Sequence, residues 1–345
     1  VSDGTNNCTI TLPATSCNLP STSVGAKTLT ATYNGDANFN GSGPSAGVPH
    51  TVNKADVTVT ITSDNPDSSA VGQNVTVAFT VAASAPGAGT PTGTVTITIS
   101  GGSETCTGTL AAGSGSCTLA LTTPGNRTLT ATYNGDSNYN TGTDTEPHTV
   151  VGPPTIVKVF TPSSTPINGT STLSITISNP AANTVALTGV SFTDNFPTNL
   201  VVANPLTITN TCSGTLQDGG GGALNAGDTG IRLTGGSVGI SSSCTVSVNV
   251  TPTAAGPHVN TTGNVTSANG GTGNTATSTL QTNTPPTISS NTVLVKAGSS
   301  ATPFTIATAV DPDQAVNTLG ITINGNPTTA SSNGVTVSGV AIQPS

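Results

Sequence analysis

The chain has 345 residues, of which only 6% are charged, and its formal net charge is −8. Its six basic residues are too few for the clustered positive charge that binding to nucleic acid or to an anionic membrane surface needs. Aromatic residues make up 3% of the chain and Trp is absent, which disfavours base stacking. No apolar run approaches the roughly 18 residues that span a membrane as a helix.

Alternation of apolar residues with threonine predicts an all-β chain. Val57, Val59 and Ile61 are separated by threonines, and three later runs repeat this pattern. The later runs are 75–81, 95–99 and 129–133. Each run places apolar side chains on one face of a strand and polar side chains on the other, and turn-forming residues separate the runs. Short strands at this spacing predict β-sandwiches.

An internal repeat sets the size of the structural unit. The sequence TLTATYNGD occurs at 28–36 and again at 128–136, an offset of 100 residues. Cys17 and Cys117 share this offset. The repeat therefore has about one hundred residues, the size of one immunoglobulin-like (Ig-like) sandwich.

The repeat and the changes in composition predict four segments in an elongated array of tandem Ig-like sandwiches. Residues 1–52 correspond to the C-terminal half of the repeat, and residues 53–151 to a complete copy with seven strands. Residues 152–281 form a different β-sandwich with a Gly-rich excursion at 218–230, and residues 282–345 begin a further cadherin-like or Ig-like domain. The seven strands are expected near 55–62, 74–83, 93–100, 105–111, 116–122, 127–134 and 147–151.

The sequence shows no signal peptide, which predicts a mature or internal piece, and its first and last domains are expected to be incomplete. Half a sandwich cannot bury its own apolar face. Either a longer chain completes the end domains, or a neighbouring copy of the same protein does so by β-strand complementation.

Two motifs resemble known bacterial families. At TLTATYNGDANFN and TLTATYNGDSNYN the chain resembles the bacterial Ig-like repeats that carry T-A-x-Y-x-G-D before their last strand. Residues 154–281 are similar to a conserved repeat domain of unknown function in very large bacterial surface proteins. That similarity is carried by Lys158, Phe160, Pro162 and Asn179. The resemblance implies an exported, extracellular surface protein and supplies no catalytic residues.

Strand parity predicts disulfides between neighbouring cysteines. Within each of the first two pairs, Cys8–Cys17 and Cys106–Cys117, both cysteines point to the apolar face of strands joined by a short connection. Elimination leaves Cys212–Cys244 as the third pair. A zinc site would need Cys-x-x-Cys or Cys–His spacings that the sequence lacks.

The three histidines and one nucleophile-like motif are expected to have no catalytic role. His50, His148 and His258 each follow a proline at the start of a late strand, and they fall in separate domains. Residues 235–239 match G-x-S-x-G, but a nucleophile elbow needs a following helix. The sequence therefore predicts neither an enzyme nor a cofactor.

Two further chemistries are weaker alternatives. Asp311 and Asp313 are calcium candidates, and Asp36 and Asp136 in Asn-Gly-Asp are more typical of turns. Lys158 is a candidate for an isopeptide bond to an asparagine. That bond needs a buried acid, which sequence alone does not identify.

The leading functional prediction is a structural role. Domains that are cross-linked by disulfides and arranged in series are expected to form a bacterial surface fibre, filament or stalk. The alternative is an adhesin that binds a glycan or a protein receptor through loops 218–230 and 84–92. The absence of Trp and the scarcity of Tyr weaken glycan binding.

Overall fold

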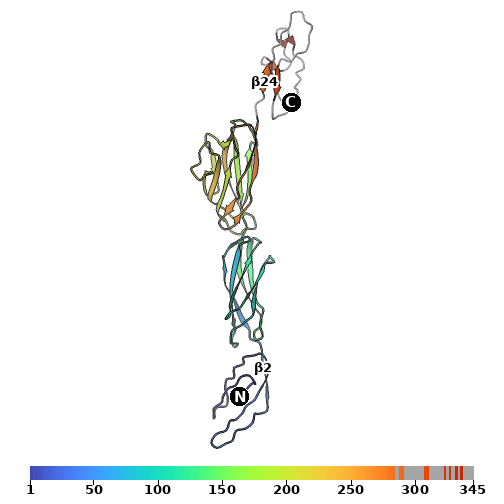
Figure 1. Cartoon of the computed structure of the whole chain (residues 1–345), viewed down its shortest axis with the longest axis vertical. Helices are drawn as coiled ribbons and strands as arrows, with labels where there is room; N and C mark the ends of the chain where they lie inside the picture. Colours follow the sequence, from blue (N-terminus) through green and yellow to red (C-terminus); the bar gives the residue numbers. More distant parts are fainter. Residues whose placement is uncertain are drawn as a thin grey trace. The chain divides into compact units, whose positions relative to one another are not determined.

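The computed structural model describes residues 1–283, together with 287–290, 307–310, 322–323, 326–327, 331–332 and 335–336. Throughout this described part the regular elements are β-strands, so the prediction of an all-β chain is confirmed. The chain divides into two compact units (Figure 1). The first is Val1–Gly152 with Ala182–Thr184, and the second is Pro153–Ala181 with Val185–Ser345.

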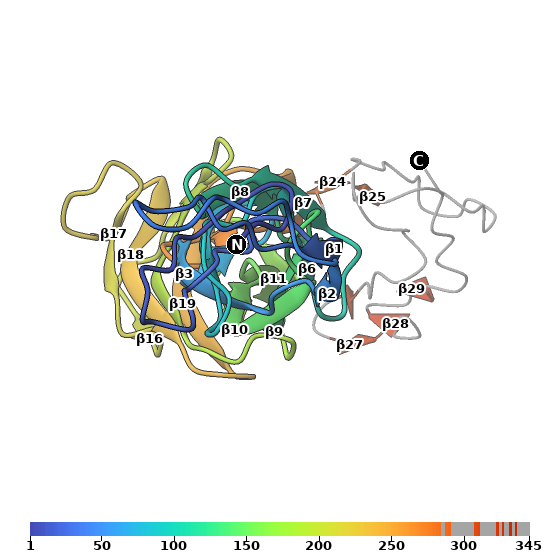
Figure 2. The same cartoon turned by 90° about the horizontal axis from the view of Figure 1, so that it is seen from below.

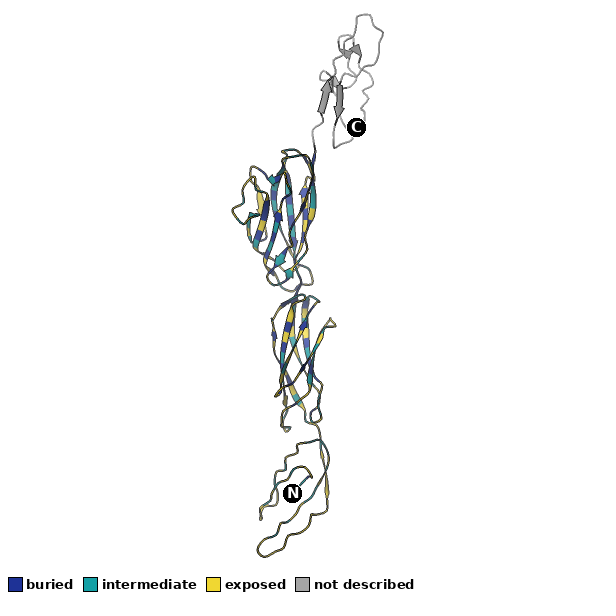
Figure 3. Cartoon of the chain, viewed as in Figure 1, coloured by how far each residue is buried: buried dark blue, intermediate teal, exposed yellow. Residues whose placement is uncertain are grey.

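Residues 1–52 contain one antiparallel strand pair, β1 (Gly25–Leu29) with β2 (Val48–Val52). Cys8 and Cys17 lie before β1 and outside any named strand, contrary to the prediction, and the isolated bridges of this segment involve Ser2 and Asn7. Most side chains of this region are exposed, as the yellow colouring shows (Figure 3).

Residues 53–151 form a sandwich of two sheets. The strands are β3 (Val57–Asn65), β4 (Ser69–Ala70), β5 (Asn74–Ala83), β6 (Thr94–Ile99), β7 (Thr105–Thr109), β8 (Ser114–Ala120), β9 (Gly125–Tyr133) and β10 (Gly142–Val151). One sheet has the order β3-β5-β8, and the other has the order β4-β10-β9-β6-β7. Strands β8 and β7 are therefore edge strands of opposite sheets.

Two details of this sandwich differ from the sequence prediction. The two-residue strand β4 pairs in parallel with the end of β10, and it is too short to show any periodicity. Strand β10 begins at Gly142 rather than near residue 147, because its polar first half pairs with β9 all the way to Tyr133. Backbone hydrogen bonds between strands can thus extend a strand into residues whose side chains show no apolar alternation.

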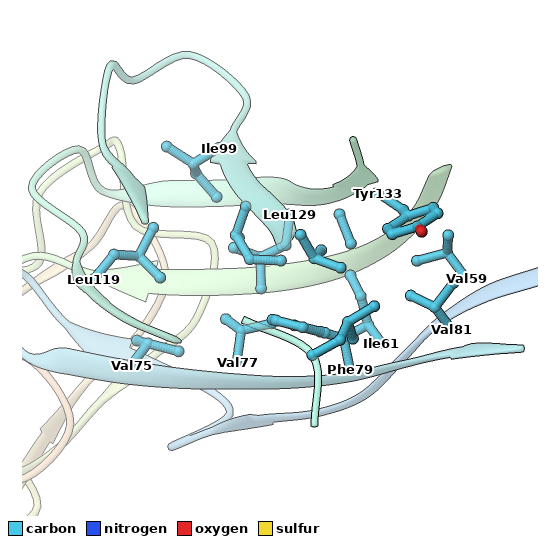
Figure 4. Close-up of a cluster of buried hydrophobic side chains, with 14 of the residues drawn as sticks. Val59, Ile61, Val75, Val77, Phe79, Val81, Ile99, Leu119, Leu129 and Tyr133 are labelled. Atoms are coloured by element: carbon cyan, nitrogen blue, oxygen red, sulfur yellow. The ribbon is translucent and has the colours of Figure 1, made fainter. Parts of the chain in front are cut away.

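The apolar faces of the two sheets meet in one core. Figure 4 shows Val75, Val77 and Phe79 of β5 pointing toward Ile99 and Leu129 of the opposite sheet. These side chains are between 0% and 8% exposed. The period-2 pattern read from the sequence is thus the pattern of core burial.

The second unit contains a larger sandwich. Its strands are β11 (Thr155–Thr161), β12 (Ser164–Pro166), β13 (Ser171–Ser178), β14 (Leu187–Asn195), β15 (Leu200–Val202), β16 (Ile208–Asn210), β17 (Thr215–Asp218), β18 (Gly230–Val238), β19 (Ser243–Pro252), β20 (Gly256–Thr261), β21 (Thr266–Ser267), β22 (Gly271–Thr272) and β23 (Thr277–Asn283). The sheet orders are β11-β13-β19-β15, with β16 also paired to β19, then β17-β18-β14-β21-β22, and β12-β23-β20. Strands β17 and β18, labelled in Figure 2, flank the Gly-rich loop.

Beyond β23, the structure describes three short antiparallel pairs. Their strands are β24 (Thr287–Ser290), β25 (Ala307–Val310), β26 (Thr322–Ile323), β27 (Asn326–Pro327), β28 (Ser331–Ser332) and β29 (Val335–Thr336). Asp311 and Asp313, the calcium candidates, lie outside the described residues. Among the described residues, no helix has the length and apolarity to cross a membrane.

Candidate functional site

Three disulfides join the pairs that strand parity and elimination favoured, Cys8–Cys17, Cys106–Cys117 and Cys212–Cys244. Cys106 lies on β7, opposite Ile97, and Cys117 lies on β8, opposite Val77. Because β7 and β8 belong to different sheets, the Cys106–Cys117 bond closes one edge of the sandwich between them.

The Cys212–Cys244 bond encloses the largest loop of the three, with a sequence separation of 32. Cys244 is the second residue of β19 and pairs with Ile177 of β13, whereas Cys212 follows β16. Both cysteines are buried, at 0% and 6% exposure. This bond therefore belongs to the core of its sandwich.

The Asn-Gly-Asp motif acts as a turn-forming device in both repeats. Asp136 Oδ1 accepts hydrogen bonds from the backbone N–H groups of Asn138 and Tyr139, at 2.8 Å and 2.9 Å. Asp36 Oδ1 accepts the equivalent bonds from Asn38 and Phe39, at 2.7 Å and 2.8 Å. The repeated carboxylate thus has the same backbone partners in each copy, as expected for turn chemistry.

Acid is expected to destabilise residues 53–151. Burial raises the pKa of Asp136, but hydrogen bonds from Thr92, Asn138 and Tyr139 outweigh burial and lower that pKa to about 2. Since the pKa in an unfolded chain is about 3.9, the stabilisation is complete above that pH and disappears as the pH falls toward 2. Hydrogen bonds from Thr122 likewise lower the pKa of Glu104 to about 2. Urea unfolding at several pH values from about 5 to about 2 measures the loss, because the two carboxylates become protonated roughly within this range.

Tyrosine fluorescence reports mainly on this region, because Tyr133 and Tyr139 lie within it and the third tyrosine, Tyr33, precedes it. Asp136→Asn should flatten the acid dependence, and adding Glu104→Gln should flatten it further. If the free energy of unfolding falls with acid equally in the wild type and in both variants, Asp136 and Glu104 are not the groups responsible.

The structure places the three histidines in three different environments. His50 lies exposed on β2, and His258 is 5% exposed with its Nε2 3.1 Å from the Ala254 carbonyl oxygen. His148, in contrast, has its Nδ1 2.7 Å from Asp64 Oδ2 and its Nε2 2.9 Å from Ser69 Oγ. His148 therefore has an acidic partner, Asp64, which the sequence analysis did not identify.

The Asp64–Ser69–His148 cluster connects the two sheets of the sandwich. Asp64 lies near the end of β3, whereas Ser69 and His148 lie on β4 and β10 of the other sheet. The order of hydrogen bonds is that of a Ser-His-Asp triad, but Ser69 is only 1% exposed and His148 only 2%. A serine nucleophile must reach a substrate, so this burial supports a structural role.

Asp67 also lies near this cluster. Ligand atoms of Asp64, Asp67 and His148 lie within 4.8 Å of one another. Both ring nitrogens of His148 already contact protein oxygens. A cation bound there would have to displace one of these hydrogen bonds.

His148→Leu is expected to destabilise residues 53–151 by about 1–3 kcal/mol, because it leaves buried Asp64 and Ser69 without their partner. The triple variant Asp64→Val, Ser69→Ala, His148→Leu should regain part of this loss, since no polar group is then left unpaired. Urea unfolding followed by tyrosine fluorescence gives both values. A triple variant that is less stable than His148→Leu would show that the shape of the cluster matters more than its polarity.

A second buried cluster lies in residues 154–282 and consists of Lys158, Asp194 and Asn260. Lys158 Nζ donates to Asp194 Oδ1 at 2.7 Å, and both side chains are completely buried. Asn260 Nδ2 donates to the other oxygen of Asp194 at 3.2 Å. Asn260 is 1% exposed, and its Oδ1 is a buried atom without a hydrogen-bond partner. We call these three residues the Lys–Asp–Asn cluster.

Each member of the Lys–Asp–Asn cluster comes from a different sheet. Lys158 lies on β11, Asp194 on β14 and Asn260 on β20. On β11, Lys158 points inward between Ile156 and Phe160. Its outward neighbours are apolar, with Val157 63% and Val159 51% exposed. This reversed pattern places an ionisable group in the core where an apolar residue is usual.

Burial moves both ionisable groups of the cluster toward their neutral forms. Burial lowers the pKa of the Lys158 amine, and the nearby Asp194 carboxylate only partly opposes this. Burial raises the pKa of the Asp194 carboxyl, against the opposing effect of Lys158 and Asn260. Both shifts make the neutral amine and the protonated carboxyl easier to reach than they are in water.

Sequence reasoning selected Lys158 but missed Asp194 and Asn260. Strand parity could have indicated Asp194, because it alternates with Val190 and Phe192, and all three are buried. Parity gives no such signal for Asn260, because its apolar neighbour Val259 is 55% exposed. The contact between the three strands, however, depends on how their three sheets pack together. Strand parity alone does not give that packing.

The Gly-rich loop at 218–230, one of the two loops considered for binding, is held by its own hydrogen bonds. In the Gly-rich loop, Asp218 Oδ1 accepts from the Gly222 N–H at 2.8 Å, and the Asp218 carbonyl accepts from Gly221 at 3.1 Å. Asn225 N donates to Asp228 Oδ2 at 2.6 Å. Its acidic side chains thus form hydrogen bonds within the loop itself.

The family models match the two sandwiches separately. Residues 57–151 match the model of the bacterial Ig-like domain, group 3. This segment is therefore similar to the bacterial Ig-like domains of that group. Residues 154–282 match a domain of unknown function, DUF7933. The predicted resemblance of both segments is confirmed. A comparison with curated proteins finds no match.

The solved structures that match this chain include two streptococcal protein domains. The C-terminal domain of the BspA antigen I/II polypeptide of Streptococcus agalactiae is 11% identical, with a TM-score of 0.37; the match covers 73% of this chain and 99% of that one. The C-terminal domain of the antigen I/II-family protein AspA of Streptococcus pyogenes is 12% identical, with a TM-score of 0.36; here 65% of this chain and 99% of that one are covered. Both scores are low, and neither match bears on what this chain does.

Proposed function

We propose that this chain is a structural part of a bacterial extracellular surface fibre, filament or stalk. One observation carries the proposal. Two disulfides and both buried polar clusters join separate segments within a sandwich. Such contacts resist separation of strands. The disulfides also favour an oxidising compartment outside the cytoplasm.

Surface labelling of intact cells that produce the protein tests its location. An antibody raised against residues 53–151 should bind unpermeabilised cells, and brief treatment of these cells with protease should remove the signal. Electron microscopy of the labelled cells should place the label on fibres or stalks. Label found only after permeabilisation would overturn the proposal.

A second proposal is that strands from elsewhere complete residues 1–52, and the internal repeat supports it. Phe39 is 69% exposed, whereas its equivalent in the complete copy, Tyr139, is 7% exposed. His50 is exposed, but its equivalent His148 is 2% exposed. In the complete copy, β3 to β6 contribute much of the core that covers these positions. We infer that equivalent strands, from a neighbouring domain or from another copy of the protein, cover residues 1–52 by β-strand complementation.

A chimaera tests this second proposal. A duplicate of residues 53–104 placed directly before Asn7 supplies the missing strands in the order of the complete copy. It should reduce the binding of a hydrophobic dye and protect β1 and β2 from hydrogen exchange. The matched control carries Phe79→Asp in the duplicate, because a carboxylate at this core position prevents packing. Equal dye binding by the chimaera, its control and the parent chain would overturn the proposal.

A further inference from the structure

The Lys–Asp–Asn cluster places an amine and a carboxamide on the two oxygens of one carboxyl group. Lys158 Nζ lies 2.7 Å from Asp194 Oδ1, and Asn260 Nδ2 lies 3.2 Å from Asp194 Oδ2. The two strands that carry these groups, β11 and β20, belong to different sheets and are not hydrogen-bonded neighbours. The protein thus holds two groups that can condense, with a proton-transfer group between them.

We propose that Lys158 and Asn260 form a covalent isopeptide bond, and that Asp194 transfers the protons needed for this reaction. The bond joins Lys158 Nζ to Asn260 Cγ and fixes β11 to β20. The inference goes beyond the surface role and does not depend on it, because the mass of the chain tests it directly.

The burial of the cluster supplies the reactive forms. An ammonium group has no free electron pair and cannot attack, so the reaction needs the neutral amine. Burial lowers the pKa of Lys158 and raises that of Asp194, which favours transfer of a proton from the amine to the carboxylate. The apolar residues that alternate with the cluster along β11 and β14 keep water away from the amide carbon.

The unpaired oxygen of Asn260 gives an independent reason. Asn260 Oδ1 is buried and has no hydrogen-bond partner, a costly arrangement for a polar atom. Turning the carboxamide over exchanges its oxygen and nitrogen, which have nearly the same shape. The carbonyl oxygen then faces the protonated Asp194 carboxyl. A hydrogen bond from that carboxyl draws electrons from Cγ and prepares this carbon for attack.

The atoms of the reaction balance without an oxidant or any other co-reactant. Lys158 Nζ attacks Asn260 Cγ with its free electron pair and forms the N–C bond. The Cγ–Nδ2 bond breaks, and Asp194 passes protons from Nζ to the departing nitrogen. The products are a secondary amide and ammonia, so the chain loses one nitrogen and three hydrogen atoms. The Asp194 carboxyl is regenerated.

Intact-mass measurement of the purified full chain tests the proposal. With its three disulfides, the chain is six hydrogen atoms lighter than its sequence. We expect a further loss of one ammonia, which persists after reduction, and a cross-linked peptide pair that contains Lys158 and Asn260 after protease digestion. A wild-type mass that shows only the disulfides would overturn the proposal.

Two variants localise the loss. Asn-Gly sequences such as Asn134-Gly135 can also lose ammonia by cyclisation, but that loss would persist in Lys158→Met. We expect Lys158→Met and Asp194→Asn to have the full mass after reduction, and Lys54→Met, the matched control, to keep the loss. Persistence of the ammonia loss in Lys158→Met, or absence of the cross-linked peptide pair from the wild-type digest, would overturn the proposal whether or not the variants fold.

Discussion

Asp194→Asn is expected to lower the free energy of unfolding of residues 154–282 by at least about 3–5 kcal/mol, the usual cost of leaving a buried charge without its partner. Burial lowers the pKa of the Lys158 amine and Asp194 opposes this effect, so the variant leaves a completely buried amine without the group that compensates for its burial. Hydrogen exchange of β11, β14 and β20 in the full chain measures the change and separates it from residues 53–151. Unchanged exchange in these strands would mean that the Lys158–Asp194 contact contributes little to stability.

A double variant separates the ionic contribution from the covalent one. Lys158→Met with Asp194→Leu removes both charges and keeps apolar volume, which is often nearly neutral for an ion pair. If the isopeptide bond forms, this variant also loses a cross-link between residues 102 positions apart (260 − 158 = 102). A closed loop of that size is worth about 4–5 kcal/mol. A double variant as stable as the wild type would therefore speak against the cross-link.

Removal of the Cys212–Cys244 disulfide should have the next largest effect, about 4 kcal/mol for a loop with a sequence separation of 32. The double variant Cys212→Ala, Cys244→Ala also leaves small gaps, because both positions are buried. Denaturant unfolding monitored by circular dichroism gives the loss for residues 154–282.

The Cys8→Ala, Cys17→Ala variant is the matched control. Both of its cysteines are only partly buried, and they lie outside residues 154–282. It should leave the unfolding of that domain unchanged. Equal effects of the two double variants on residues 154–282 would contradict the assignment of Cys212–Cys244 to that core.

Local pattern accounted for much of the fold because strand parity is a short-range property. The alternation at Val75, Val77 and Phe79 gave both the strand and its buried face, and these residues lie in the core. The same parity indicated how Cys106 and Cys117 would meet. Strand β4 and the first half of β10 were missed, because backbone pairing rather than side-chain burial defines them.

The polar clusters show where sequence reasoning stops. His148 was assigned to an architectural position, but its partner Asp64 is 84 residues away and comes from the other sheet. The motif in the sequence pointed to Lys158. Asp194 and Asn260 contact it only because the three sheets that carry these residues pack together. Such contacts depend on topology, which a single sequence with many equivalent Thr-rich strands does not determine.

The closed loop between Cys212 and Cys244 has a consequence for a chain under tension. The 31 residues inside it (244 − 212 − 1 = 31) include β17, β18 and the Gly-rich loop between them. Tension applied through the ends of the chain passes across the sulfur–sulfur bond, so about 100 Å of polypeptide cannot be drawn out while that bond is intact. The loop at 219–229 can therefore change in length and sequence without altering how far the chain stretches.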